Sequence, residues 1–317
     1  MTEHRTAFVT GATGAVGPAL VSRLLDEGYR VRALVRPGRE PRLPAGVEPV
    51  TGYLDDDAAI AEGVAGADVV FHLAALLHVN APGPELALRY LDVNVRGTER
   101  LLEAARGAGV ARFVFFSTIN AYGPSDGGAP WRESDPVRPL TPYARTKAEA
   151  EQRVLAEPGG VVLRLAAVYG PGMRGNYRTL AVLLARGLPV LPGTGSNRRT
   201  LVHRDDVASA ALLAAEHPAA TGNVFNVTDG DIHAFDEIVR AVQRAAGRRP
   251  GVRYLPAAPL LALARVARVS HLVERVTEDV AVSGERIQHA LGFVPRVPLD
   301  AGWRDVLRSF GREGGRA

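Results

Sequence analysis

Residues 6–17 read TAFVTGATGAVG and decide the fold of this chain. A short apolar strand leads into a glycine-rich turn, which opens an apolar-periodic stretch that continues as a helix to Glu27. Glycines in such a turn permit a tight bend, close approach of the backbone to a pyrophosphate and close packing of helix on strand. The amides at the helix start attract an anion. Because a second strand is expected at 29–35, this stretch predicts a dinucleotide-binding unit.

Lys147 is the only lysine among the 38 lysine and arginine residues of the chain. It follows Tyr143 by four positions, so on a helix the phenol and the ammonium project from one face, one turn apart. An ammonium is a compact point charge that a guanidinium does not replace. A cation beside a phenol favours the phenolate, so the spacing predicts a lowered pKa for Tyr143. Such a tyrosine exchanges a proton with substrate near neutral pH.

The glycine pattern and the Tyr143/Lys147 pair resemble the extended short-chain dehydrogenase/reductase family, which comprises NAD(P)-dependent epimerases and dehydratases, here of the nucleotide-sugar-modifying type. Several further blocks resemble the family and follow in its order. These blocks are FHLAA at 71–75, NVRGT at 94–98, FVFFSTINAYG at 113–123, VYGPG at 168–172 and LVHRDDV at 201–207.

The expected elements alternate through the first half of the chain. Strands are expected near 6–10, 30–35, 68–72, 112–117 and 161–165, and helices near 15–27, 85–108 and 143–156. This alternation predicts an α/β fold with a parallel sheet covered on both faces, and the resemblance implies that it is a Rossmann-type doubly wound parallel sheet with a smaller C-terminal α/β substrate-binding lobe. The resemblance implies an NAD(P)-binding domain at 1–167 with returning segments at about 199–227, a lobe at 168–198 and 228–310 that includes a helix near 177–186, and a flexible tail at 311–317.

Composition and charge narrow the classes of function that the chain can have. The chain has 317 residues, 46% of them hydrophobic, and a net charge of +4, and its arginines are scattered without the footprint of nucleic-acid binding. Zero cysteines exclude disulfides and thiolate metal sites. The acidic triplet at 55–57 predicts a helix N-cap rather than a metal site. With no membrane-length apolar run and no visible signal sequence, we expect a cytoplasmic enzyme with a small, anionic substrate.

The resemblance implies which residues contact the cofactor. These are Gly11, Thr13, Gly14, Ala15, Val16 and Gly17 in the turn, Leu54 on the adenine side, Ala74 and Ala75 after the fourth strand, and Tyr143 and Lys147. The second strand ends in Arg36 without the acidic residue that binds the ribose of NAD, and a guanidinium there pairs with a 2′-phosphate. NADP is therefore favoured over NAD, the alternative being a solvated arginine. Tyr53 stands where the family has an aspartate, so the adenine contact departs from the pattern.

The third catalytic partner is a hydroxyl that holds the substrate oxygen next to Tyr143. Counted back four residues from Tyr122, the family's serine or threonine corresponds to Thr118. The neighbouring Ser117 is a second candidate for substrate contact, although it points to the opposite face of a regular strand. The resemblance implies that Lys147 assists Tyr143 and hydrogen-bonds the nicotinamide ribose.

Two residues of the second half resemble the diphosphate contacts of nucleotide-sugar enzymes. Asn176 follows the YGPG motif, and Arg199 lies four residues before His203; arginine suits bidentate recognition of phosphate. The alternative for both is an ordinary loop residue. Ala167 replaces the family's asparagine before Tyr-Gly, which removes one expected contact. His203 is expected to be structural, before a helix that Asp205 caps.

These features predict an oxidoreductase that transfers hydride at a ketone or secondary alcohol of a nucleotide sugar, with a 4-ketoreductase as the leading interpretation. The alternatives are a 4-epimerase with tightly bound NAD, a reductase or dehydrogenase of a non-sugar ketone whose pocket the apolar stretch 257–268 would line, and a non-catalytic NADP-sensing protein. A 4,6-dehydratase is not expected, because Ile119 and Asn120 stand where such enzymes carry Asp-Glu. The resemblance implies a homodimer formed through the helices near 85–108 and 143–156.

Overall fold

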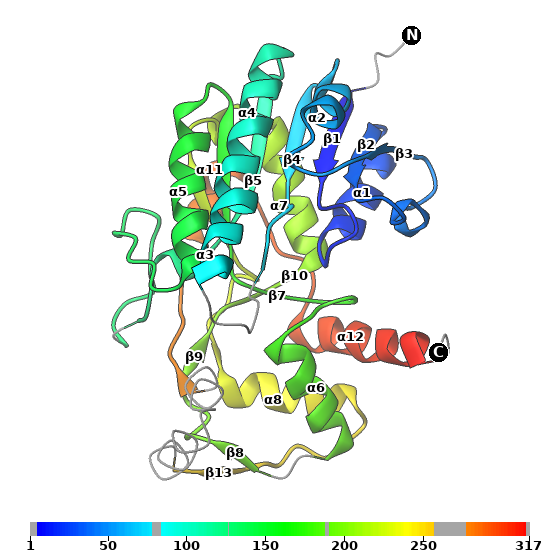
Figure 1. The fold of residues 1–317 in the computed structure, drawn as a ribbon. Helices are drawn as coiled ribbons and strands as arrows, with labels where there is room; N and C mark the ends of the chain where they lie inside the picture. The colour runs from blue at the N-terminus through cyan, green and yellow to red at the C-terminus, as the bar shows by residue number, and fades with distance from the viewer. Residues whose placement is uncertain (1–4, 78–83, 126, 188–189, 257–276, 315–317) are drawn as a thin grey trace.

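The computed structural model of the chain describes residues 5–77, 84–125, 127–187, 190–256 and 277–314. Figure 1 shows a sheet covered by helices on both faces in the upper part of the view, and a smaller lobe of helices and short strands below it. After the sixth strand the chain crosses between the sheet and the lobe, so each part is built from segments that are not continuous in the sequence.

Seven parallel strands form the central sheet, in the order β11-β6-β5-β4-β1-β2-β3. The strands are β1 (Thr6–Thr10), β2 (Arg30–Val35), β3 (Val47–Thr51), β4 (Val69–His72), β5 (Arg112–Thr118), β6 (Gly160–Leu165) and β11 (Val224–Val227). After β3 the chain crosses to the other side of β1 and adds β4 there, so the strand order reverses between β1 and β4. In open parallel sheets the crevice at this reversal, outside the carboxyl ends of the strands, is where ligands bind.

Two layers of helices cover the sheet, and successive residues of each strand pack alternately into one or the other. Ala7 and Val9 join the apolar cluster beneath α1 and α7, whereas Phe8 joins the cluster beneath α2, α4 and α5. The helices of these layers are α1 (Gly17–Asp26), α2 (Asp57–Val64), α3 (Pro84–Leu91), α4 (Gly97–Gly107), α5 (Pro142–Ala156), α7 (Arg204–Glu216) and α11 (Glu285–Leu291). The predicted doubly wound fold is confirmed.

The segment predicted as one helix at 85–108 is divided. A π-helical turn at Asp92–Arg96 separates α3 from α4. Asn94 is buried in this turn, and its side chain donates to the carbonyl of Leu76 (3.2 Å) and to Oγ1 of Thr146 (3.1 Å). The turn therefore holds the segment after β4 against α5.

The lobe is built from pairs of short strands and three helices. The pairs are β7 (Ala167–Tyr169) with β10 (Leu201–His203), β9 (Arg198–Arg199) with β12 (His233–Ala234), and β8 (Val190–Pro192) with β13 (Arg253–Leu255). The helices are α6 (Asn176–Arg186), α8 (Phe235–Ala245) and α12 (Leu299–Gly314), which share an apolar cluster centred on Tyr169, Phe235 and Trp303. Of the segments expected to return to the sheet at 199–227, α7 and β11 do so; β9 and β10 instead pair outside it.

Two helix ends test the predicted caps. The carboxylate of Asp56 accepts the amide of Ala59 (3.1 Å) and caps α2, as the acidic triplet predicted. The cap of α7 is His203 rather than Asp205, because Nδ1 of His203 accepts the amide of Asp205 (3.3 Å). At the chain end α12 continues to Gly314, so the first four residues of the expected tail are helical.

Two absences hold for the described ranges only. None of their helices has the length and apolar character needed to cross a membrane. Their His, Cys, Asp and Glu side chains form no group of three suited to a metal ion. The apolar stretch 257–268 lies outside the described residues, so the pocket wall expected from it is not tested.

Candidate active site

The glycine turn lies at the reversal of strand order, where only glycine fits. Gly11 has φ of 77°, and a Cβ on it would lie 2.7 Å from the backbone nitrogen of Ala74, the second residue after β4. A Cβ on Gly17 would lie 2.2 Å from the carbonyl oxygen of Ala12. The residue before α1, Val16, offers no side-chain cap; Pro18 has no amide hydrogen and the amide of Ala19 donates to the carbonyl of Val16 (3.0 Å), which leaves the Gly17 amide of the first turn for an anion. This cradle fits the pyrophosphate of a dinucleotide.

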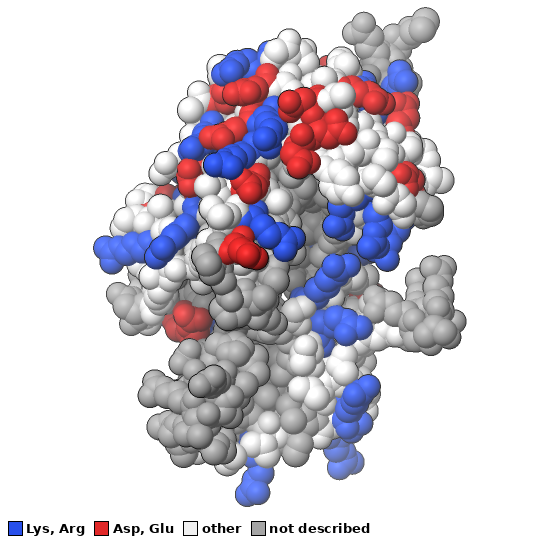
Figure 2. All heavy atoms as spheres, viewed as in Figure 1, with Lys and Arg blue, Asp and Glu red and all other residues white. Residues whose placement is uncertain are grey.

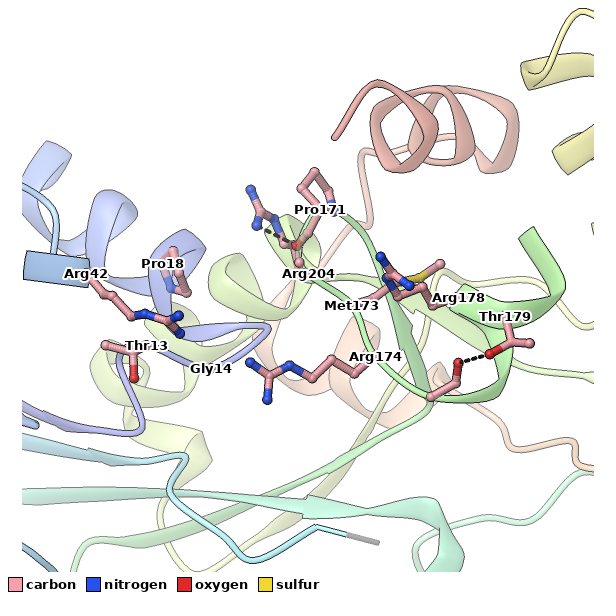
Figure 3. A pocket seen from close by; sticks show the side chains of 12 residues that line it. Thr13, Gly14, Pro18, Arg42, Pro171, Met173, Arg174, Arg178, Thr179 and Arg204 are labelled. Atoms are coloured by element: carbon pink, nitrogen blue, oxygen red, sulfur yellow. Dashed lines mark hydrogen bonds between the residues drawn. The ribbon is translucent and has the colours of Figure 1, made fainter. Parts of the chain in front are cut away.

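A cavity of about 740 Å³ lies between this turn and the segment 171–179 that enters α6. Figure 3 shows the two walls facing each other, with Thr13, Gly14 and Pro18 on one side and Pro171 to Thr179 on the other. Four arginines line the cavity, and none was singled out in the sequence. They are Arg42, Arg174, Arg178 and Arg204.

The four arginines differ in the contacts that their side chains make. Nη1 of Arg204 donates to the carbonyl of Pro171 (2.7 Å), and the guanidinium of Arg178 lies over the ring of Phe310, 5.1 Å from its centroid. Arg174 and Arg42 are exposed, and in Figure 3 their guanidinium groups extend into the cavity, towards Gly14 and Thr13 respectively. The cavity therefore presents positive charge on both walls, which suits phosphate groups.

The remaining cofactor positions lie at the same edge of the sheet. Arg36 is exposed just after β2, the neighbour of β1. Ala74 and Ala75 are half-buried after β4, and the amide of Ala74 donates to Oγ1 of Thr10 (3.2 Å). Leu54 is half-buried against α4, where a Cβ on Gly97 would lie 3.1 Å from its own Cβ. These placements are compatible with the expected contacts.

Tyr143 and Lys147 lie on the inner face of α5. Thr141 caps the helix by accepting the amide of Ala144 (3.1 Å), which places Tyr143 in the first turn. The Tyr143 side chain packs near Tyr90 of α3, with ring centroids 6.3 Å apart. Lys147 is only 1% exposed, and its Nζ lies 3.8 Å from the centroid of the Phe115 ring.

The predicted lowering of the pKa of Tyr143 is wrong for this structure. Burial raises the pKa of the phenol above its usual value, and the nearby Tyr90 adds to the rise. Burial also lowers the pKa of Lys147 to about 7, against the opposing charge of Glu151. The ammonium faces the Phe115 ring and is itself destabilised by burial, so it does not offset the desolvation of the phenol.

The two hydroxyls at the end of β5 have different surroundings. Oγ1 of Thr118 accepts the amide of Asn120 (3.2 Å) where the strand ends. Ser117 is buried, and its hydroxyl donates to the carboxylate of Glu151, which also binds Arg164. Ser117 is therefore part of an interior network rather than a substrate contact, as the alternation of strand side chains favoured. Thr118 stays the candidate catalytic hydroxyl.

The two predicted diphosphate contacts are not brought to the cavity. Asn176 is the exposed first residue of α6, next to the cavity-lining Gly175, but it is not part of the lining. Arg199 is buried in β9, where it pairs with His233 of β12. Arg174 and Arg178, from the same stretch of chain as Asn176, line the cavity instead. Their position shortly after the YGPG motif was the available signal.

A buried histidine supports the glycine turn from behind. His72 ends β4, and its Nδ1 lies 2.6 Å from Oγ1 of Thr10 while its Nε2 lies 3.0 Å from Oγ1 of Thr98. The Thr98 hydroxyl donates to the carbonyl of Asn94 (2.7 Å), so Nε2 of His72 must be the donor in the bond to Thr98. Burial, followed by the charge of Lys147, lowers the pKa of His72 to about 3 and keeps the ring neutral.

Comparison with known proteins decides the family. The sequence profile of the NAD dependent epimerase/dehydratase family matches residues 7–228. The chain belongs to this family. Members of the epimerase/dehydratase family are NAD(P)-dependent epimerases, dehydratases and reductases, so the chain is an enzyme of the extended short-chain dehydrogenase/reductase class, as the resemblance predicted. Membership speaks against the non-catalytic alternative.

Relatives within the epimerase/dehydratase family differ in the reaction their names describe. UDP-glucose 4-epimerase of Vibrio cholerae is 29% identical over 96% of this chain and 95% of its own length. The 2-alkyl-3-oxoalkanoate reductase of Stenotrophomonas maltophilia is 32% identical over 95% of this chain and 98% of its own. The solved structure of MoeE5 in complex with UDP-glucose and NAD is 32% identical, with a TM-score of 0.77 over 97% of this chain and 99% of that one.

Proposed function

We propose that the enzyme reduces a ketone to a secondary alcohol, with Tyr143 as the general acid. The observation that carries this proposal is Arg36, which is exposed directly after β2 where NAD enzymes place a carboxylate, because a site for NADPH favours net reduction over a reaction that keeps NAD bound. The buried phenol of Tyr143 is the group that donates a proton to the substrate oxygen.

Each residue of the site has a defined task in this reaction. Tyr143 donates its proton to the substrate oxygen, and the hydroxyl of Thr118 holds that oxygen. Lys147 stabilises the phenolate that forms and binds the nicotinamide ribose, while the turn at Gly11–Gly17 holds the pyrophosphate. The bound dinucleotide supplies the hydride.

We propose NADPH as the reductant. Arg36 and Arg42 are both exposed in the segment after β2, where NAD enzymes place a carboxylate. The side chain of Arg42 also reaches the cavity beside Thr13. A 2′-phosphate carries about two negative charges, so two guanidinium groups at this point favour NADPH over NADH.

The substrate that fits best is a nucleotide sugar with a keto group, as in a 4-ketoreductase. Arg174, in the loop before α6, and Arg178, in the first turn of α6, lie on the wall opposite the glycine turn, and arginine binds phosphate bidentately. In the view of Figure 2, basic side chains run from the region of β3, past the boundary between the sheet and the lobe, down to α6, with few acidic ones beside them. A related protein binds UDP-glucose together with NAD.

Two alternatives have support of their own. A relative of nearly full coverage is a UDP-glucose 4-epimerase, a class that retains NAD and both oxidises and reduces one carbon. A second relative reduces a 2-alkyl-3-oxoalkanoate, which is a ketone without a nucleotide.

The first test is the cofactor that the purified protein releases on denaturation, followed by titration with NADPH and NADH. We expect an empty protein that binds NADPH more tightly, and we expect Arg36→Ala and Arg42→Ala to weaken NADPH binding but not NADH binding. Stoichiometric NAD(H) in the released fraction would contradict net reduction and establish the epimerase.

The second test separates the substrate classes. We expect Arg174→Ala to raise KM for keto sugars linked to UDP or dTDP at least about tenfold, the loss of one charge-assisted phosphate contact. Arg186→Ala at the far end of α6 is the matched control, since Arg186 is exposed and is not part of the cavity lining. Turnover of a 2-alkyl-3-oxoalkanoate with no turnover of nucleotide-linked ketones would overturn the sugar proposal.

A further inference from the structure

The inner face of α5 carries a third ionisable residue in line with the proposed catalytic pair. Tyr143, Lys147 and Glu151 follow one another at intervals of one helical turn. Glu151 is 3% exposed, which is rare for a carboxylate in the absence of a compensating charge. The reaction assigned above uses the first two residues and leaves Glu151 without a role.

Glu151 is the centre of a buried network under the sheet. Nε of Arg164 donates to both of its carboxylate oxygens (3.1 Å each), and Nη2 of Arg164 donates to one of them (2.7 Å). The hydroxyl of Ser117 donates to the same carboxylate. The guanidinium lies over the ring of Tyr122, 4.7 Å from its centroid. Arg164 and Ser117 are neighbours on β6 and β5, so the sheet fixes both partners.

The surroundings of Lys147 contain few other charges. The charge of Glu151 on α5 acts on Lys147, the ammonium in turn acts on His72 of β4, and it lies over the Phe115 ring of β5. The other ionisable and polar groups of this region contact its neighbours: Tyr90 of α3 packs near Tyr143, and Ser117 of β5 and Arg164 of β6 bind Glu151. His72 is neutral at physiological pH. Within the described part of the chain, Glu151 is thus the carboxylate whose charge acts on the ammonium.

Lys147 and Arg164 are both influenced by the negative charge of one carboxylate, that of Glu151. Burial favours neutral Lys147, and the negative charge of Glu151 favours the ammonium. Arg164 binds the same carboxylate with two nitrogen atoms and partly neutralises it. The charge that Lys147 experiences from Glu151 therefore depends on Arg164.

We propose that Glu151 is a positioning residue that sets the protonation of Lys147, and that Arg164 attenuates it. The catalytic meaning of this inference rests on the proposed function, because only there does the ammonium stabilise a phenolate. The inference itself concerns one ionisation in the full-length chain, and that ionisation exists whether or not the enzyme reduces a ketone.

The chain offers a direct measurement, because Lys147 is its only lysine. Isotopically labelled lysine gives a single side-chain Cε resonance in NMR, and its shift as a function of pH reports the titration of one group. The parent is compared with Glu151→Gln, Arg164→Gln and the double variant. Glu149→Gln is the matched control, since Glu149 lies on the same helix but is partly exposed and pairs with Arg153.

The two single variants are expected to shift the titration midpoint in opposite directions. Glu151→Gln removes the anion and lowers the midpoint by about one pH unit. Arg164→Gln removes the competitor and raises it by a similar amount. The control leaves it at the parent value. An unchanged midpoint in Glu151→Gln, or shifts of the same sign in both variants, would overturn the proposal.

The double variant keeps the test decisive if a buried, unpaired charge prevents a single variant from folding. Without either charge its midpoint is expected below that of the parent, and a midpoint equal to the parent's would contradict the role of Glu151. An activity profile adds the functional meaning: Glu151→Gln is expected to move the alkaline limb of kcat/KM to lower pH. Full activity of Tyr143→Phe would refute the proposed function and leave the NMR result standing.

Discussion

The phenol of Tyr143 lies among groups that keep it protonated in the free enzyme. It is buried beside Tyr90, and the nearby cation is turned to an aromatic ring. A reaction that starts with proton donation needs this state, and one that starts with proton removal must first lower the pKa of the phenol. The free enzyme therefore holds Tyr143 in the form that donates a proton.

Replacement of Tyr143 by phenylalanine tests its role. We expect Tyr143→Phe to lower kcat by about 10²–10⁴-fold, the usual contribution of a general acid. Binding of NADPH, measured by fluorescence titration, is expected to change little, because the ring remains and the glycine turn is untouched. Normal turnover in this variant would show that another group donates the proton.

Replacement of Lys147 by arginine keeps the charge and changes its shape. The side chain is 1% exposed with Nζ over the Phe115 ring, so the broader guanidinium has no free volume to enter. We expect Lys147→Arg to lose most turnover. Arg145→Lys is the control, since Arg145 is exposed on the same helix and the reverse exchange there is expected to leave turnover unchanged. Equal activity of Lys147→Arg and parent would refute a requirement for the ammonium.

Spacing along the sequence predicted some residues of the site and missed others. Tyr143, Lys147 and Thr118 were predicted from helical spacing and family resemblance, because the signal for each lies within one short stretch of sequence. Arg42 and Arg174 come from segments far apart in the chain, and only the packing of the lobe against the sheet brings them to one cavity. Their side chains are unremarkable as sequence, since arginine is common throughout the chain.

At the scale of elements, the turn from β1 to α1 depends on backbone contacts that a methyl group would prevent. We expect Gly17→Ala to destabilise the fold by about 1–3 kcal/mol, the range for overpacking, because its Cβ would meet the Ala12 carbonyl at 2.2 Å. NADPH binding should weaken as well, since the amides of this turn shift. Urea denaturation and cofactor titration measure both effects.

Gly107→Ala is the control for this prediction. Gly107 ends α4, and a methyl group on its Cα would have no atom within 4 Å, so alanine there is expected to be neutral or to stabilise by up to about 1 kcal/mol. Equal stability of the two alanine variants would show that the turn tolerates rearrangement.

Buried, continuous elements were easier to predict than exposed or interrupted ones. The strands β1, β2, β5 and β6 lie close to their predicted ranges, whereas β3, in which only Val50 is buried, was absent from the prediction, and α2 was indicated only by its acidic N-cap. The π turn that divides α3 from α4 cannot be read from apolar periodicity, because the residue that it buries against α5, Asn94, is polar.

At the scale of the whole molecule, the predicted homodimer is still a prediction, and the structure defines how to test it. The outer face of α4 and α5 carries ion pairs, among them Arg153 with Glu99 and Arg106 with Glu157, and Figure 2 shows charges of both signs interspersed there. Interfaces built on such pairs weaken as salt screens them. We expect twice the mass of one chain in sedimentation at low salt, with dissociation favoured at high salt. A monomer at low salt would contradict the prediction.

Acid stability is expected to depend on His72. In the fold its ring stays neutral down to a pKa of about 3, whereas in the unfolded chain it binds a proton near pH 6.5. The unfolded state therefore binds the extra proton between these values, and the free energy of unfolding falls as pH falls through this window. The destabilisation caused by His72→Gln should then shrink by about 2 kcal/mol between pH 7 and pH 5 in urea denaturation.

The exposed His289 on α11 provides the comparison. The variant His289→Gln is measured at both values of pH as a control for the loss of an exposed imidazole. A cost of His72→Gln that does not change with pH would show that the ring has the same pKa in the folded and the unfolded chain.

The burial of the only lysine also determines how amine-reactive reagents act on this protein. An activated ester, an aldehyde or a lysine-specific protease finds no side-chain amine at the surface, because Lys147 is 1% exposed on the inner face of α5. Cleavage or labelling at Lys147 would require α5 to separate from the sheet, and its rate would report how often the catalytic helix opens.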